Sequence, residues 1–207
     1  MLEQKGAIAE LRDCLRSLPL FRHPAAGERS TVQQMMNTYI DRVLSVDGGW
    51  DYHPPAARIT GSRLAADFRK CFGDCQVHAE VQFGNVARWY SDMFKFQVAY
   101  SQELVDVGVS VVPMSDLAIT IGENIVNYER AKRELHAARN SIGLPILLIG
   151  LAPRGDTPVV DLSCCGLDYK AITGKKAQSN RYRIIDAYLQ GHRISAVHRH
   201  SPTGAMA

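Results

Sequence analysis

The sequence predicts an α/β fold: a central mixed β-sheet flanked by helices. Runs of alternating or continuously apolar residues, typical of strands, alternate along the chain with longer runs whose apolar residues recur at helical spacing. The 207 residues contain no internal repeat and no linker long enough to divide them. With 46% hydrophobic and 22% charged residues, the composition is that of an ordinary globular domain, so we expect one domain over residues 1–207.

Helical spacing is clear near the start of the chain. Residues 7–18 follow a helical pattern, and a second helix is expected to begin at Ser30, with Gln33 completing a capping box. The Asp47-Gly48-Gly49 segment should end that helix. Its apolar positions are expected to lie in the core; they are Val32, Met35, Met36, Tyr39, Ile40, Val43 and Leu44.

Two strands joined by a tight turn are expected next. In the second strand, apolar residues at odd positions 77–83 alternate with His78, Glu80 and Gln82, so one face should be core and the other available for chemistry. Gly73-Asp74 is a good two-residue hairpin connection. This turn fixes the pairing: Asp67 opposite Glu80, Phe68 opposite Ala79, Ala66 opposite Val81 and Leu64 opposite Phe83.

The remaining elements are shorter or less regular in pattern. We expect a helix capped by Asn85 over about 86–102, a buried strand over 106–114, a long charged helix over 123–140, a fully buried strand over 146–151, another strand over 159–162, and a short helix over 182–189 that stops before Gly191. This order favours helices on both faces of the sheet.

Two facing carboxylates indicate a metal site. Directly opposed Cβ atoms lie roughly 4.5–5.5 Å apart, where Asp67 and Glu80 repel each other unless a cation lies between them. Oxygen ligands suit Mg²⁺, and the carbonyl of Val81 is a third candidate ligand. Such a metal polarises a phosphate and acidifies a bound water, which Gln82 would orient. The alternative is that Asp67 and Glu80 are ordinary solvent-exposed residues on the polar face of a strand and form no site.

The segment 79–114 reads AEVQFGNVARWYSDMFKFQVAYSQELVDVGVSVVPM. It closely resembles the core of the BglII/BstYI-type type II restriction endonucleases of the PD-(D/E)XK nuclease superfamily. In that branch a Glu-x-Gln strand is followed by Phe-Gly-Asn, a helix, and an Asp-Val-Gly strand that ends in Val-Pro. The counterparts here are Glu80, Gln82, Phe83-Gly84-Asn85, Val105-Asp106-Val107-Gly108 and Val112-Pro113. The resemblance extends more weakly back to Ser30 and forward to about Leu135.

The resemblance implies a restriction-endonuclease-like fold with a catalytic core over about 60–152. It implies a Mg²⁺-dependent, site-specific deoxyribonuclease that hydrolyses double-stranded DNA at a short palindrome. Asp67, Glu80 and Gln82 would be catalytic, and Asp67, Glu80 and Val81 would hold the metal. The family's first acidic residue usually lies closer to Glu-x-Gln, which leaves Asp74 as an alternative to Asp67. The register favours Asp67, because Asp74 occupies the turn.

Partners follow from the same resemblance. A palindromic target implies a homodimer, with the helices after Asn85 and after Gly122 as candidate dimer surfaces, and a restriction enzyme implies a cognate DNA methyltransferase that is not a physical partner. Asparagine pairs bidentately with adenine, and glutamate accepts from cytosine. The candidate base contacts are therefore Asn85, Glu123, Asn124 and Asn127, although each also suits a cap or a solvated surface. The segment after Pro113 matches the family in position better than in residues, so the target sequence stays open.

Charge and cysteines add weaker signals. The net charge is only +3, but residues 168–207 contain seven basic and two acidic side chains, which suits phosphate contacts or a solvated helix. An odd count of five cysteines, without a secretion signal or a membrane-length apolar run, favours reduced thiols in a cytoplasmic protein. Cys71, Cys75 and His78 raise the question of zinc, but no fourth ligand is evident.

Two other functions remain open. One is a repair or recombination nuclease of the same superfamily, which would share Asp67, Glu80 and Gln82 but cut by DNA structure rather than by sequence. The other is a DNA-binding protein without catalysis, which is favoured if Asp67 does not approach Glu80.

Overall fold

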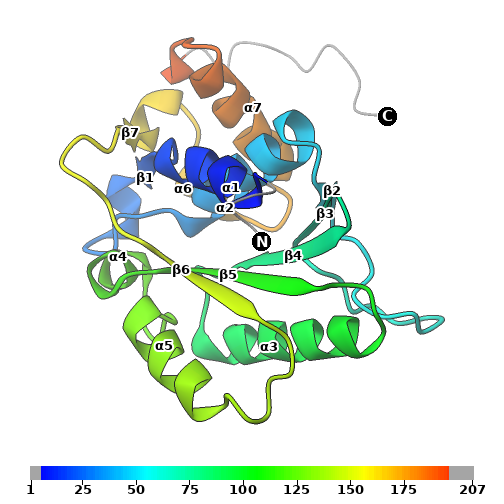
Figure 1. The fold of residues 1–207 in the computed structure, drawn as a ribbon. Helices are drawn as coiled ribbons and strands as arrows, with labels where there is room; N and C mark the ends of the chain where they lie inside the picture. Colours follow the sequence, from blue (N-terminus) through cyan, green and yellow to red (C-terminus); the bar gives the residue numbers. More distant parts are fainter. Residues whose placement is uncertain (1–5, 196–207) are drawn as a thin grey trace.

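A five-stranded mixed sheet in the order β2-β3-β4-β5-β6 lies at the centre of the molecule (Figure 1). The computed structural model describes residues 6–195. The two pairings among β2, β3 and β4 are antiparallel, and the two among β4, β5 and β6 are parallel. The strands are β2 (Asp51–Tyr52), β3 (Phe68–Phe72), β4 (Cys75–Val81), β5 (Val107–Pro113) and β6 (Ile146–Leu151). The predicted α/β class and mixed sheet are confirmed.

Helices cover both faces of this sheet (Figure 1). On one face lie α1 (Ala7–Arg16) and α2 (Gln33–Asp41), which continues as a π-helical segment over Arg42–Asp47. On the other face lie α3 (Val86–Ser101) and α5 (Tyr128–Ala137). Each face has its own apolar core. Met35, Met36 and Tyr39 are buried in the first of these cores, as predicted.

The β3–β4 hairpin has the predicted register over β3 itself, but the ladder ends at Phe68 and does not include the predicted pairs Asp67–Glu80, Ala66–Val81 and Leu64–Phe83. Residues 64–66 instead pair with residues 54–56, since Ala66 N–H donates to the Pro54 carbonyl and the Leu64 carbonyl accepts from Ala56 N–H. Phe68 pairs with Ala79, and Phe72 pairs with Cys75 next to the turn. Gly73 in that turn has a φ of 65°, a conformation that glycine adopts without steric cost. Asp67 directly precedes β3 and therefore lies at the same end of the hairpin as Val81, where β4 ends.

The predicted start of α2 is wrong. Ser30 does not cap the helix, which begins at Gln33 after Val32, a residue with no side-chain cap. The backbone before it is used elsewhere: Thr31 forms an antiparallel bridge with Arg22, and the Ser30 carbonyl accepts from His23 N–H. Because Ser30 and Thr31 are extended and pair with residues 22 and 23, the predicted capping box does not form.

The single long helix predicted over 123–140 is also wrong. A short helix, α4 (Ser115–Ile121), ends before Gly122, and α5 starts only at Tyr128. Asn124 has a φ of 52°, and the Asn127 side chain caps α5 by accepting from Arg130 N–H. Asparagine is favoured at both kinds of position and disfavoured inside helices, so the two asparagines interrupt the charged pattern.

Two predicted strands have a different environment from the one expected. β6 was expected to be fully buried, but it is the edge strand of the sheet and all of its residues are partly exposed. β7 (Val159–Asp161) is not in the central sheet and pairs in parallel with β1 (Leu20–Arg22). Alternate side chains of β6 still pack on both apolar cores, so its partial exposure comes from its place at the sheet edge, whereas in β7 only Val160 is buried.

The last described helices pack against α2. The helix predicted over 182–189 begins earlier, as α7 (Gln178–Leu189), and follows the short α6 (Tyr169–Thr173). Arg181 donates to Thr38, and Arg42 pairs with Asp186, so α7 is tied to α2. Two 3-10 turns complete the described elements, at Pro24–Ala26 and Leu162–Cys165. Within residues 6–195, no helix has both the length and the apolar character to cross a membrane.

Candidate active site

A cavity of about 390 Å³ opens where β4 ends. Three predicted site residues, Asp67, Val81 and Gln82, line it. Its walls also contain polar residues that the sequence reading missed, contributed by α2 and α3: Asn37, Asp41, Arg88, Asp92 and Lys95. The turn residue Asp74, the alternative to Asp67, is at the opposite end of the hairpin.

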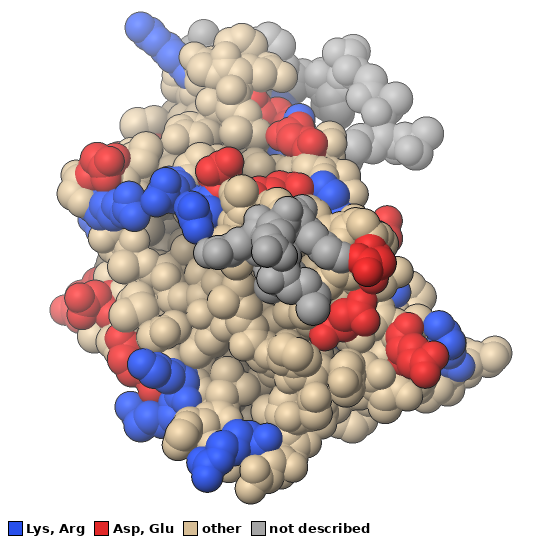
Figure 2. Space-filling view, in the orientation of Figure 1, with Lys and Arg blue, Asp and Glu red and all other residues tan. Residues whose placement is uncertain are grey.

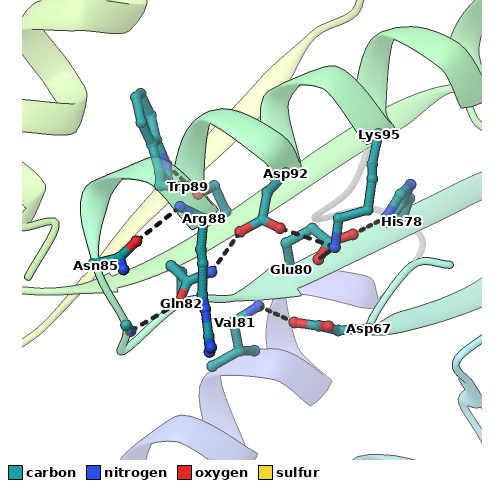
Figure 3. A network of polar contacts seen from close by, with 12 residues as sticks. Asp67, His78, Glu80, Val81, Gln82, Asn85, Arg88, Trp89, Asp92 and Lys95 are labelled. Atoms are coloured by element: carbon teal, nitrogen blue, oxygen red, sulfur yellow. Dashed lines mark hydrogen bonds and ion pairs between the residues drawn. The ribbon is translucent and has the colours of Figure 1, made fainter. Parts of the chain in front are cut away.

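Glu80 lies behind the cavity wall and is completely buried. Its carboxylate is held from two sides, with His78 Nε2 2.5 Å from Oε1 and Lys95 Nζ 2.5 Å from Oε2 (Figure 3). The face of β4 that was expected to be open is therefore covered by α3. Both faces of β4 are buried along most of its length, which strand periodicity alone does not distinguish from one buried face.

Close packing brings α3 to this face of the sheet. Gly108 of β5 pairs with His78 of β4. A Cβ at Gly108 would lie 3.0 Å from the Phe96 ring of α3, so glycine allows the helix to approach. Farther along, Trp89 Nε1 donates to Ser110 Oγ on β5 at 3.2 Å. These contacts place Lys95, next to Phe96, above Glu80.

Asp67 is directed toward the end of β4. Its Oδ2 accepts from the backbone N–H of Val81 at 3.0 Å (Figure 3). Val81 lies beyond the last β3–β4 residue pair, so the side chain of Asp67 takes the place of a strand partner. The predicted approach of Asp67 to the Glu80–Val81 segment is therefore present in the structure.

The Gln82 amide is engaged at both ends. Its Nε2 donates to Asp92 Oδ2 at 2.9 Å, and its Oε1 accepts from Gly84 N–H at 2.8 Å. A Cβ at Gly84 would lie 2.6 Å from that same Oε1, so glycine is needed for the side chain to fold back. Gln82 therefore lies on the cavity wall in one fixed orientation, with Arg88 running beside it (Figure 3).

The electrostatics of the site come from burial and crowded carboxylates. Burial, with Asp67 and Asp92 adding to it, raises the pKa of Glu80, and burial also raises the pKa of Asp67. Burial disfavours the ammonium of Lys95, but Glu80, Asp92 and Asp67 together raise its pKa. Lys95 thus contacts two of the three carboxyl groups that crowd this wall, and the carboxyl groups outnumber the cation.

His78 is neutral at physiological pH. Burial, with Lys95 and Arg69 adding to it, lowers its pKa to about 3. Since Glu80 faces Nε2, the proton is assigned to Nε2, and the imidazole donates to the carboxylate. The ring packs edge-on to Phe96, 4.7 Å between centroids, so its orientation is fixed.

The α2 wall adds a fourth carboxyl group. Burial raises the pKa of Asp41 to about 7, and the nearby Asp67 contributes. Tyr52 donates to Asp41 at 3.4 Å. One turn earlier on the same helix face, Asn37 has a buried Oδ1 with no hydrogen-bond partner among the described residues. The cavity wall thus contains several oxygen acceptors, and the Asn37 Oδ1 among them has no hydrogen-bond partner in the described part of the chain.

These oxygens fit a hard cation such as Mg²⁺ in kind. In the present arrangement, residues 6–195 contain no three histidine, cysteine, aspartate or glutamate side chains that converge closely enough to hold a metal ion. That finding also covers Cys71, Cys75 and His78, the set considered for zinc. Cys71 is exposed and Cys75 is buried.

Three of the predicted base-contacting residues lie on two joined loops, the first of which follows directly from Gln82 at the cavity wall. Asn85 and Ile125 form an antiparallel bridge, and Val86 N–H donates to the Asn124 carbonyl at 3.1 Å. Asn85, Glu123 and Asn124 are exposed on these two joined loops, and Glu123 pairs with Arg29. Asn127 instead caps α5, and Asn85 caps α3 as predicted.

The residues that sequence reading missed carried one recognisable signal. Trp89, Asp92, Met93 and Phe96 are all buried on the same stripe of α3. A charged residue within a core-facing stripe is unusual, because burying a carboxylate is costly unless it is paired. Asp92 breaks the apolar pattern, and Lys95 follows one turn later to pair with it.

The mixed sheet and the buried carboxylates at the end of β4 together define a restriction-endonuclease-like protein. The comparisons with known proteins extend this. Over residues 1–151 the chain matches the family described as restriction endonuclease BglII/BglIII, and it belongs to that family. It is thus a type II restriction endonuclease, and the resemblance found in residues 79–114 is confirmed over a longer span.

Solved structures show the same fold. The crystal structure of restriction endonuclease BglII complexed with a DNA 16-mer has a TM-score of 0.61 and 20% sequence identity, covering 75% of this chain and 75% of that chain. The crystal structure of free BglII has a TM-score of 0.55 at 20% identity, covering 75% and 76%. A search of curated proteins finds no match.

Proposed function

We propose that this endonuclease hydrolyses the phosphodiester bonds of double-stranded DNA at a short palindromic sequence with Mg²⁺ as cofactor. The observation that carries the proposal is the approach of Asp67 to the end of β4, where its Oδ2 accepts from Val81 N–H and its charge acts on the neighbouring Glu80, beside a cavity lined by oxygen acceptors. Asp67, Glu80 and the Val81 carbonyl would hold the metal. The relative of known structure that was solved with a DNA 16-mer supports DNA as the substrate.

Each nearby side chain has a role in this proposal. Bound Mg²⁺ would polarise the scissile phosphate and acidify a water molecule. His78 fixes the rotamer of Glu80 from behind, and Asp92 and Gly84 fix the amide of Gln82, which orients water at the cavity wall. Arg88 is exposed at the cavity and has a permanent charge, so it suits a DNA phosphate.

Recognition would come from the two joined loops beside the cavity. Asn85, Glu123 and Asn124 are exposed there. The Gly84 carbonyl accepts from Val126 N–H, which holds the second loop beside the segment that contains Gln82. Asn127 belongs to the same loop but already accepts from Arg130 N–H. Base-edge readout by Asn and Glu side chains is the physical basis for sequence-specific rather than structure-dependent cutting, which favours this function over a repair or recombination nuclease.

A homodimer would match a palindromic target, and α3 with α5 offers a surface for it. Tyr90 and Phe94 of α3 are 46% and 61% exposed, although both are large aromatic residues. Arg130 of α5 donates to the Tyr90 hydroxyl at 3.4 Å and joins the two helices. Aromatic residues with arginine are typical of protein interfaces, so Phe94→Asp should shift the dimer to monomer in sedimentation velocity, whereas Ile59→Asp, at an equally exposed site, should not.

Basic side chains would supply further phosphate contacts. Lys170, Lys175 and Lys176 line a shallow hollow in the C-terminal part. A second group of exposed basic residues, Lys132, Arg133 and Arg139, lies on and just after α5 (Figure 2). Positive charge is thus not confined to residues 168–207. His198, Arg199 and His200 lie outside the described residues.

Plasmid cleavage tests the whole proposal. Purified protein is incubated with plasmid and either MgCl₂ or EDTA, and the fragment ends are sequenced. We expect discrete fragments with a common end sequence only with MgCl₂, and loss of cutting on DNA modified by a cognate methyltransferase. Fragments without a common end would support a repair or recombination nuclease. Plasmid that is bound but uncut with every divalent metal would support a protein without catalysis.

A further inference from the structure

Lys95 brings a cation into contact with buried carboxylates at the cavity. Its Nζ lies 2.5 Å from Glu80 Oε2 and 2.9 Å from Asp92 Oδ1 (Figure 3). Glu80 and Asp92 are 0% and 4% exposed. Buried carboxylates without a cation would either destabilise the fold or take up protons. In the metal-free protein, Lys95 therefore supplies the neutralising charge.

The ammonium lies within the field of the same carboxylates that the proposed function assigns to the metal. Glu80, Asp92 and Asp67 all favour its charged form. With the ammonium bridging Glu80 and Asp92, and with Asp67 turned to the Val81 N–H, the donor set across the described chain is not gathered for a metal ion. A second cation at Glu80 would meet strong repulsion from Lys95.

Lys95 has room to move. Its side chain is 12% exposed and forms part of the cavity wall. Lysine has a long flexible stem ending in a point charge, so the ammonium can swing into the cavity of about 390 Å³ while α3 stays packed on the sheet. His78, by contrast, is sealed behind Glu80 and cannot leave.

We propose that Lys95 occupies the position of the divalent metal ion in the metal-free enzyme, and that metal binding displaces its ammonium from Glu80. This inference rests on the proposed function, since it takes Asp67 and Glu80 as metal ligands. Lys95 is then a positioning residue that keeps the carboxylates together before metal arrives and weakens the affinity for metal. A neutral residue at position 95 removes that competition.

Isothermal titration with MnCl₂ in the absence of DNA tests this. Lys95→Met should bind Mn²⁺ at least about tenfold more tightly than the wild type, because a unit charge a few ångströms away is removed. Lys95→Arg, which keeps the charge, should not bind more tightly than the wild type. Arg63→Met, which removes an exposed positive charge that has no role in the proposed site, is the control and should bind as the wild type does.

A second measurement uses the unaltered protein and does not depend on how Lys95→Met folds. Lysine ammonium groups are followed by ¹⁵N NMR, with the Lys95 signal assigned by its loss in Lys95→Arg. Addition of Mg²⁺ should change that signal and leave the others in place. Metal binding by the wild type with an unchanged Lys95 signal, or with no gain in Lys95→Met, would overturn the displacement alone. No metal binding by any variant would overturn the proposed metal site as well.

Discussion

His78 places Nε2 2.5 Å from Oε1 of Glu80, two residues farther along the same face of β4. Both side chains are completely buried, and the imidazole is neutral because burial lowers its pKa to about 3. A neutral donor in a fixed ring gives the carboxylate one orientation without adding charge. The geometry of Glu80 therefore depends on a residue that never reaches the cavity.

Replacement of His78 should lower the rate of cleavage more than the affinity for DNA. We expect His78→Ala to reduce kcat by about 10- to 100-fold with little change in KM, since a misplaced ligand acts on the chemical step. His78→Gln, which keeps a donor, should recover part of kcat. Circular dichroism gives the folded fraction of each variant, and the rates are compared after correction to equal folded fraction. A wild-type kcat in His78→Ala would show that Glu80 does not need this support.

Loss of the Glu80 carboxylate should slow cleavage strongly and leave binding largely intact. For Glu80→Ala we expect roughly 10²- to 10³-fold slower cleavage, the scale seen when a transition-state electrostatic group is removed. Plasmid cleavage gives the rate, and fluorescence anisotropy with Ca²⁺ gives DNA affinity. Asp116→Asn, at an exposed acidic position, is the control. Cleavage at the wild-type rate by Glu80→Ala would disprove the assigned site.

A single methyl group at position 84 should disturb Gln82. In Gly84→Ala the new Cβ would lie 2.6 Å from Gln82 Oε1, so the amide must leave Gly84 or Asp92. We expect a loss of about 1–3 kcal/mol in the free energy of unfolding and slower cleavage. Gly155→Ala is the matched control, because its Cβ would meet no atom within 4 Å. Urea unfolding compares the two, and equal curves would contradict the fixed position of Gln82.

Asp41 should make the metal-free protein less stable as pH rises. Its pKa is raised to about 7 by burial, so the folded state binds its proton more tightly than the unfolded chain, where the pKa is about 4. The free energy of unfolding therefore falls between about pH 4 and pH 7. Asp41→Asn should gain up to about 4 kcal/mol at pH 8 and almost nothing at pH 4.

Urea unfolding in EDTA at pH 4, 6 and 8 measures this difference. Asp116→Asn should keep the pH dependence of the wild type, since that side chain is exposed. A parallel pH profile for Asp41→Asn and wild type would mean that Asp41 is not protonated in the folded protein at neutral pH.

Local patterns in the sequence were enough to predict the hairpin that carries the site. A period of two residues, with Gly73-Asp74 as the turn, determined the register that pairs Phe68 with Ala79 and brings Asp67 to the end of β4. The Asn85 cap and the motif of residues 79–114 were equally readable. Such features depend on neighbours in the chain, whose backbone geometry and turn chemistry are encoded locally.

The tertiary structure decided what surrounds those residues. Sequence periodicity marked the His78 and Glu80 face of β4 as open, but α3 covers it, because Gly108 lets Phe96 pack closely there. The same packing brings Lys95 to Glu80. Contacts between a helix and a strand depend on the relative placement of whole elements, which no local pattern specifies. The placement of Asp67 and Glu80 at one end of the hairpin was thus determined by the sequence itself, whereas the burial of Glu80 and its contact with Lys95 came only with the fold.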